Sequence, residues 1–124
     1  MRKLAITMGL LSLLMGCTKT QSENITIIDS KTAYEMMQNE EVTIIDVRTK
    51  EEYEDGHILN AINLDVSYIG NTIPTELPNL DSKILIYCRS GSRSNQAALK
   101  LEKLGYTNLY DFGGLNSWPY EIVK

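Results

Sequence analysis

The sequence predicts an α/β fold in which a parallel β-sheet is covered by helices on both faces. Segments rich in β-branched residues alternate along the chain with segments of helical periodicity, a pattern typical of parallel sheets. Residues 42–47 (VTIIDV) and 84–87 (ILIY) are almost continuously apolar, as expected of strands that are buried on both faces. The length of 124 residues corresponds to a single domain.

The first residues have the pattern of a targeting segment. Arg2 and Lys3 precede the apolar run 4–16, whose thirteen residues are short for a membrane span of roughly 20 but suit a signal-peptide core. The run ends in Leu-Met-Gly before Cys17 and resembles the lipobox of bacterial lipoproteins. An ordinary secretory signal with a chance cysteine is the alternative.

The lipobox resemblance implies a division of the chain into three parts. Residues 1–16 would be a lipoprotein signal peptide, and residues 17–23 would be the lipidated Cys17 with a polar tether. Residues 24–124 would be the folded domain, anchored by its lipid to a bacterial membrane outside the cytoplasm.

Five segments of the folded part have the composition of strands. They are residues 25–28, 42–47, 61–64, 84–87 and 109–112.

Three helices are expected between these strands. Ser30 can cap the first of them. Thr49 precedes the second, and Glu52 follows three positions later with the spacing of a capping box. The third covers residues 92–104 and is stopped by Gly105, which is suited to the left-handed conformation at a helix end.

Charge and composition exclude several classes of function. Twelve Lys and Arg face sixteen Asp and Glu, and loss of Arg2 and Lys3 with the signal would change the net charge from -4 to -6. An acidic domain without a basic run is a poor partner for nucleic acid. One histidine and two cysteines cannot supply the usual four ligands of zinc, so we expect no metal and no cofactor. A disulfide between Cys17 and Cys88 is rejected, because each cysteine lies in a sequence context of its own.

The turn after residues 84–87 is the strongest candidate for a functional site. It reads Cys88-Arg89-Ser90-Gly91-Ser92-Arg93 and enters a helix directly. Ligands of parallel sheets bind beyond the carboxyl ends of strands, and free N–H groups at a helix start attract anions. Gly91 allows the backbone to curl into an anion nest, while two arginines and two serines add charge and hydroxyl donors.

A thiol at Cys88 is expected to lose its proton readily in this setting and to act as a nucleophile. The same donors would hold a persulfide, sulfite or thiosulfate anion. A general base is not required, and His57, the only histidine, is distant in sequence. The alternatives are a buried cysteine that packs as a small apolar residue and, for Arg89, a solvated surface charge.

The chain resembles the rhodanese domain family in three ordered segments. These are residues 45–48 with 51–58, residues 86–94 with Ala97, and residues 104–106 with 113–115 and Trp118. The resemblance implies a five-stranded parallel sheet and a cysteine, Cys88, that alternates between thiol and persulfide. Sulfur would come from thiosulfate or a persulfide donor and pass to a thiol, cyanide or a protein cysteine.

The resemblance also implies roles for other residues. Ser90 to Arg93 would form the cradle, and Arg93 would contact the sulfonate oxygens of the donor. Asp46, Arg48 and His57 match positions near the site that are expected to be structural. The family commonly has Pro-Gly before an alanine where this chain has Leu59-Asn60, a departure that bears on turn geometry. A monomer is expected.

Other functions remain open. A cysteine phosphatase or arsenate reductase with a related loop needs five residues between cysteine and arginine, and only four separate Cys88 from Arg93. A non-catalytic binding module would not need the cysteine and cradle that this chain keeps. A carrier that moves sulfur between proteins would use the same residues as the enzyme.

Overall fold

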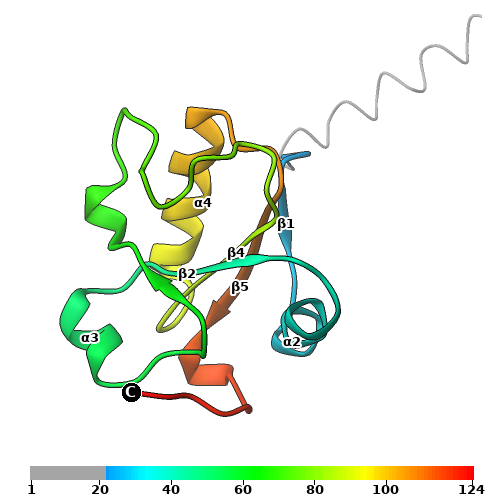
Figure 1. The fold of residues 1–124 in the computed structure, drawn as a ribbon, viewed down its shortest axis with the longest axis vertical. Helices are drawn as coiled ribbons and strands as arrows, with labels where there is room; N and C mark the ends of the chain where they lie inside the picture. Colours follow the sequence, from blue (N-terminus) through cyan, green and yellow to red (C-terminus); the bar gives the residue numbers. More distant parts are fainter. Residues whose placement is uncertain (1–21) are drawn as a thin grey trace, which may run out of the picture.

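The computed structural model describes residues 22–124, in which five strands form one sheet with helices on both sides (Figure 1). The strands are β1 (Ile25–Ile27), β2 (Thr43–Asp46), β3 (Ile62–Asn63), β4 (Ile84–Cys88) and β5 (Leu109–Gly114). The helices are α2 (Ser30–Asn39), α3 (Lys50–Glu54) and α4 (Ser92–Leu104), with the 3₁₀ turns η2 (Val66–Tyr68) and η3 (Leu115–Ser117). All strands run parallel in the order β1-β5-β4-β2-β3, which confirms the predicted α/β fold. The predicted signal peptide and Cys17 lie outside the described residues.

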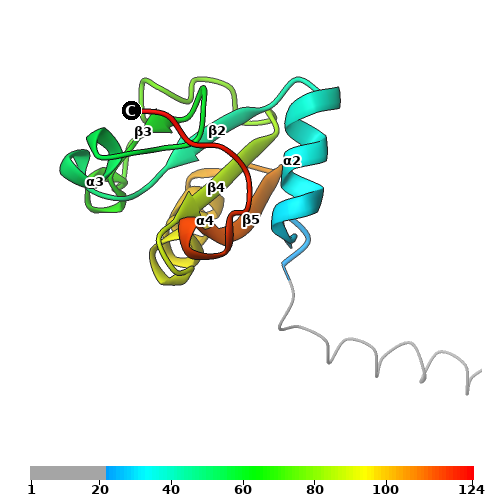
Figure 2. The same ribbon diagram turned by 90° about the horizontal axis from the view of Figure 1, so that it is seen from below.

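The sheet separates two apolar clusters. Successive side chains of a strand point to opposite faces, so Ile84 and Ile86 of β4 join one cluster while Leu85 and Tyr87 join the other. Helix α4 covers the first cluster and α2 covers the second, and Figure 2 shows the two helices on opposite sides of the sheet. All five residues of β4 are buried, as its apolar sequence predicts.

Local capping signals place most of the helix boundaries. Thr49 and Glu52 form the predicted capping box of α3, and Gly105 ends α4 with φ +111°. The cap of α2 is Asp29 rather than Ser30, because the Asp29 carboxylate accepts the N–H of Thr32 at 2.9 Å. Within residues 22–124, no helix has the length and apolar character needed to cross a membrane.

Two backbone features adjust the strand ends near the predicted site. Strand β5 extends two residues beyond the predicted end, and a register shift after Ile86 pairs Cys88 with Gly114. Asn60 has φ +72°, so the position that differs from the family pattern still adopts a left-handed conformation. Asparagine tolerates this conformation better than most residues that carry a side chain.

Candidate active site

Cys88 lies at the carboxyl end of the central strand β4, and its side chain is only 1% exposed. Its Sγ accepts the backbone N–H of Gly91, with an N···S distance of 3.0 Å, and that of Ser94 at 3.3 Å. Both donors belong to the first turn of α4 or the residue before it. The two N–H groups lie at the positive end of the helix, where backbone donors commonly bind anions.

The conformation of Gly91 makes this arrangement possible. Gly91 precedes α4 with φ +111°, a left-handed value that residues with a Cβ rarely adopt, and no side chain caps the helix there. The free N–H groups of the first turn can therefore face the sulfur. The sequence predicted this curl, but the second donor, Ser94, lies beyond the predicted cradle.

The two arginines of the loop share one carboxylate. Arg93 donates to Glu52 through Nη1 at 2.7 Å and Nη2 at 3.1 Å, and Arg89 donates through Nη2 at 3.2 Å. The hydrogen bond from Arg93 holds the pKa of Glu52 far below its usual value of 4.5, so Glu52 is ionised at neutral pH. The two guanidinium groups and the Glu52 carboxylate together carry a net formal charge of +1.

Glu52 is held in this position by the start of α3. Its Oε1 accepts the backbone N–H of Thr49 at 3.0 Å, which is the capping-box contact. Figure 1 shows α3 at the end of the sheet where β4 and β5 finish. The sequence assigned Glu52 a capping role alone, and only the fold reveals that it also binds the arginines.

Strand β5 and the turn η3 that follows it both contact the loop. The Ser94 hydroxyl donates to Asp111 Oδ1 at 2.7 Å, and the N–H of Asn116 donates to the carbonyl of Arg89 at 3.0 Å. Gly114 lies so close that a Cβ on it would be 2.0 Å from the Arg89 carbonyl oxygen. The other two predicted cradle residues, Ser90 and Ser92, are exposed.

Asp46 and Arg48 form a buried ion pair beside the site. Arg48 Nη2 donates to Asp46 Oδ2 at 2.6 Å and to the carbonyl of Gly56 at 2.7 Å. Burial alone would lower the pKa of Arg48, but the hydrogen bond and charge of Asp46 raise it. The pair ties the end of β2 to the segment that follows α3.

His57 holds the same segment. Its Nδ1 lies 2.8 Å from the carbonyl oxygen of Tyr53, and the two rings stack with centroids 3.7 Å apart. Its backbone N–H donates to the carbonyl of Val123 at 2.8 Å. The contacts of His57 in the described structure therefore join α3 to the carboxyl-terminal segment, and they do not involve Cys88.

Among residues 22–124, no three His, Cys, Asp or Glu side chains lie close enough together to hold a metal ion. Cys88 is the one cysteine of this range and forms no disulfide within it. The groups gathered at the site are the Cys88 sulfur, backbone N–H groups, two guanidinium groups and the Glu52 carboxylate.

Comparisons with known proteins identify the family of the chain. The family profile described as "Rhodanese-like domain" matches residues 29–120. The thiosulfate sulfurtransferase PspE of Escherichia coli is 37% identical over 74 residues, which cover 60% of this chain and 71% of that protein.

Solved structures show the same fold. The structure described as a rhodanese with anions from E. coli is 33% identical with a TM-score of 0.62, covering 68% of this chain and 99% of that one. A rhodanese-related protein of Thermoplasma volcanium is 30% identical with a TM-score of 0.67, covering 79% and 97% of the two chains. The chain belongs to the rhodanese-like domain family.

Proposed function

We propose that the protein is a sulfurtransferase that carries sulfane sulfur as a persulfide of Cys88. The observation that carries this proposal is the pair of backbone N–H groups, from Gly91 and Ser94, that converge on the Cys88 sulfur at the start of α4. A cysteine that only filled space in the core would have no need of these donors. Membership of the rhodanese-like family and similarity to a thiosulfate sulfurtransferase support the same class of reaction.

In the first step the Cys88 thiolate attacks the outer sulfur of thiosulfate. A new bond joins that sulfur to Sγ, the S–S bond of thiosulfate breaks, and its electron pair leaves with sulfite. The negative charge of the enzyme moves outward to the terminal sulfur, still near the positive end of α4. Arg93 and Arg89 lie beside this path and would attract the sulfonate oxygens of the donor.

In the second step a nucleophilic acceptor attacks the terminal sulfur. The bond between the two persulfide sulfurs breaks, and its electron pair returns to Cys88 as a thiolate. Cyanide would yield thiocyanate, and a thiol or protein cysteine would yield a new persulfide. No redox partner is required, because the sulfur leaves with the oxidation state in which it arrived.

The size of the loop favours a sulfur anion over phosphate. Four residues separate Cys88 from Arg93, whereas the phosphatase loop needs five to surround a tetrahedral phosphate. We therefore prefer sulfur transfer to phosphate hydrolysis as the proposed activity.

The test is the substitution Cys88→Ser. We expect it to abolish sulfur transfer from thiosulfate to cyanide, because serine cannot form a persulfide. Mass spectrometry of the protein without the substitution should show one added sulfur on Cys88 after thiosulfate treatment. Urea unfolding of the variant serves as the control for folding. Sulfur transfer that survives in a folded Cys88→Ser variant would contradict the mechanism.

We also propose that Cys17 is lipidated and anchors the domain to a bacterial membrane outside the cytoplasm. Support comes from the apolar run 4–16 and the Leu-Met-Gly that precedes Cys17. In a bacterial host, Cys17→Ala should move the protein from the membrane fraction to the soluble fraction after washing with salt, while Cys88→Ser should not. Membrane association that is unchanged in Cys17→Ala would contradict lipidation.

A further inference from the structure

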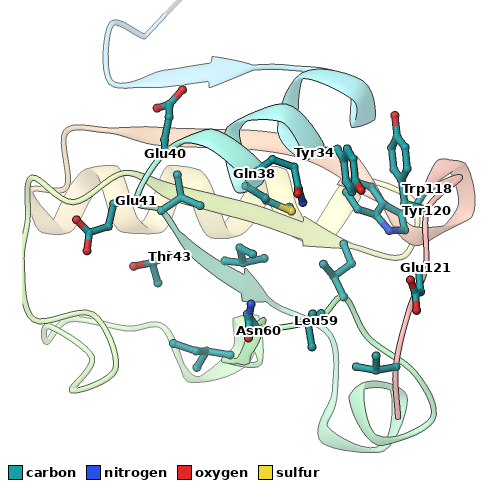
Figure 3. Close-up of a pocket in the computed structure, with 16 residues that line it drawn as sticks. Tyr34, Gln38, Glu40, Glu41, Thr43, Leu59, Asn60, Trp118, Tyr120 and Glu121 are labelled. Atoms are coloured by element: carbon teal, nitrogen blue, oxygen red, sulfur yellow. The ribbon is translucent and has the colours of Figure 1, made fainter.

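A groove of about 540 Å³ lies on the α2 side of the sheet, away from the Cys88 loop (Figure 3). Helix α2 packs over β5 on this face, and the groove opens over β2 and β3, next to the carboxyl-terminal segment. Its floor includes Met37, Ile44, Leu59 and Ile62. Leu59 is 60% exposed and Ile62 is 37% exposed, so part of this apolar surface is open to solvent.

Three aromatic side chains form one end of the groove. The rings of Tyr34 and Tyr120 stack with centroids 4.0 Å apart, and Trp118 stands edge-on to Tyr120 at 5.0 Å. Figure 3 shows these three side chains gathered at the same end. The indole N–H of Trp118 is buried and has no hydrogen-bond acceptor within residues 22–124.

The charged residues that line the groove are all acidic. They are Glu40, Glu41 and Glu121, and no Lys or Arg lines it. Glu40 is paired with Lys83 at 2.5 Å, whereas Glu41 and Glu121 form no ion pair within the described part of the chain. Figure 3 places Glu41 and Glu121 toward opposite ends of the groove. An occupant would therefore meet apolar floor and aromatic faces between two unpaired carboxylates.

We propose that this groove binds an extended segment of a partner protein in which apolar residues alternate with Lys or Arg. Alternation places the apolar side chains of an extended segment on one side, toward the floor, and leaves the cations for the rim. The carboxylates of Glu41 and Glu121 and the aromatic faces at Tyr120 both attract such cations. A second copy of this chain is a poor occupant, because residues 22–124 contain nine basic and sixteen acidic residues. Its excess of acidic groups would be repelled by the carboxylates of the groove.

Side-chain and backbone contacts link the aromatic end of the groove to the Cys88 loop. Trp118 contacts Phe112 with ring centroids 5.5 Å apart, and Phe112 contacts Tyr87, which precedes Cys88, at 5.4 Å. Asn116, two residues before Trp118, donates to the carbonyl of Arg89 in the loop. A docked partner would hold its own sulfur donor or acceptor near this end of the sheet. That consequence rests on the proposed sulfur transfer, whereas the binding itself does not.

The test uses three acetylated and amidated octapeptides and the fluorescence of Trp118, the single tryptophan of the chain. The first peptide repeats Val-Arg, the second Val-Glu and the third Ser-Arg. Eight extended residues span about 26 Å at ~3.3 Å per residue. We expect the Val-Arg peptide to cause a saturable shift in Trp118 emission that weakens with added salt, and the other two to cause little change.

Matched variants locate the binding site. The double variant Glu41→Gln with Glu121→Gln should weaken binding of the Val-Arg peptide roughly threefold to tenfold, since each exposed ion pair contributes modestly. Glu23→Gln with Glu76→Gln removes the same charge from exposed positions outside the groove and should leave the affinity unchanged. Cys88→Ser should also bind the peptide with unchanged affinity.

Several results would overturn the proposal. They are equal binding of the Val-Glu or Ser-Arg peptide, an unaltered Trp118 spectrum, and equal affinities for the two double variants. Sedimentation that shows a dimer of the full chain, dissociated by Leu59→Arg, would assign the groove to a second copy instead. If the peptide fails to bind but sulfur transfer is intact, only the proposed binding role of the groove is refuted. If sulfur transfer is absent but the peptide binds, only the proposed sulfurtransferase activity is refuted.

Discussion

At the scale of single residues, Cys88 is buried as deeply as a structural cysteine, yet its sulfur accepts two backbone N–H groups. Both donors converge on the sulfur itself, so they could stabilise negative charge on it or on a persulfide formed there. Ser90 and Ser92 are exposed, so a small anion could approach the proposed nucleophile from their side of the loop.

Gly114 controls the shape of this loop by its lack of a side chain. Its φ of -157° is ordinary extended backbone, so any effect of substitution is steric. Gly114→Ala would place a Cβ 2.0 Å from the Arg89 carbonyl oxygen and 2.7 Å from the Ser90 nitrogen. We expect a loss of about 1–3 kcal/mol in the free energy of unfolding, as for other overpacked sites. Thiosulfate sulfur transfer should fall by at least about tenfold, which is ~1.4 kcal/mol of transition-state stabilisation.

Gly70→Ala is the matched control. No heavy atom lies within 4 Å of a Cβ built on Gly70, so we expect the free energy of unfolding to stay within about 0.5 kcal/mol of the parent. Urea denaturation and a thiosulfate-to-cyanide assay measure both variants. Equal behaviour of the two variants would show that the loop does not depend on the close approach of Gly114.

At the scale of elements, α3 is too short to be stable alone. It has five residues, and isolated helices of this length do not persist in water. Its capping box fixes the first turn, while Glu52 ties that turn to Arg89 and Arg93 of the Cys88 loop. The helix and the loop therefore stabilise one another, although they are separated in sequence by about forty residues.

Substitution of Glu52 should reveal this coupling through its pH dependence. Arg93 lowers the pKa of Glu52 in the folded protein below the usual 4.5 of the unfolded chain. The resulting stabilisation is complete above about pH 4.5 and is lost as the pH falls further. Glu52→Gln keeps a side chain that can complete the capping box but removes the charge. We expect Glu52→Gln to cost roughly 1 kcal/mol at pH 7 and less at pH 3.

Urea unfolding at both pH values measures this effect. Glu54→Gln is the control, since Glu54 lies on the same helix and is exposed, with only a distant contact to Lys50 at 4.0 Å. It should change stability little at either pH. A cost for Glu52→Gln that is the same at pH 3 as at pH 7 would mean that its ion pairs contribute nothing.

At the scale of the whole molecule, the sheet organises both stability and function. Strand β4 lies at its centre, is paired with β2 and β5, and ends at Cys88. Strand β3 has two residues and is paired only with β2 at an edge. Cys88, the proposed nucleophile, therefore lies at the end of the central strand of the sheet.

Native-state hydrogen exchange should follow this order. The amides of Ile84–Tyr87 are buried and hydrogen-bonded between two strands, so we expect them to exchange only through global unfolding. The amides of Ile62 and Asn63 at the sheet edge should exchange through local opening at much lower free energy. NMR-detected exchange measures both sets, and equal protection of β3 and β4 would contradict this account.

Much of the fold was predictable from neighbouring residues. Apolar runs indicated β2 and β4, and the Thr49–Glu52 spacing and Gly105 marked helix ends that the structure confirms. Gly91 and the helix predicted after Cys88 indicated an anion site at the carboxyl end of a strand. These signals are readable because each arises within a few residues, as hydrogen-bond caps, side-chain periodicity or backbone conformation. The predicted cap of α2, Ser30, was wrong by one residue, because the cap is Asp29. Both residue types are good caps, and only the contacts in the folded chain decide between them.

The sequence by itself therefore determined the α/β class, the order of elements and the loop that holds Cys88. Only the tertiary structure decided what surrounds that loop. Glu52 binds Arg89 and Arg93, which lie 37 and 41 positions further along the chain. Gly114 approaches Arg89 closely, and the acidic groove forms between α2 and the carboxyl-terminal segment. These contacts depend on the strand order β1-β5-β4-β2-β3, which brings distant segments to the same end or face of the sheet. Local patterns carry no information about such neighbours, because the energy that selects them comes from packing the whole sheet between its two apolar clusters.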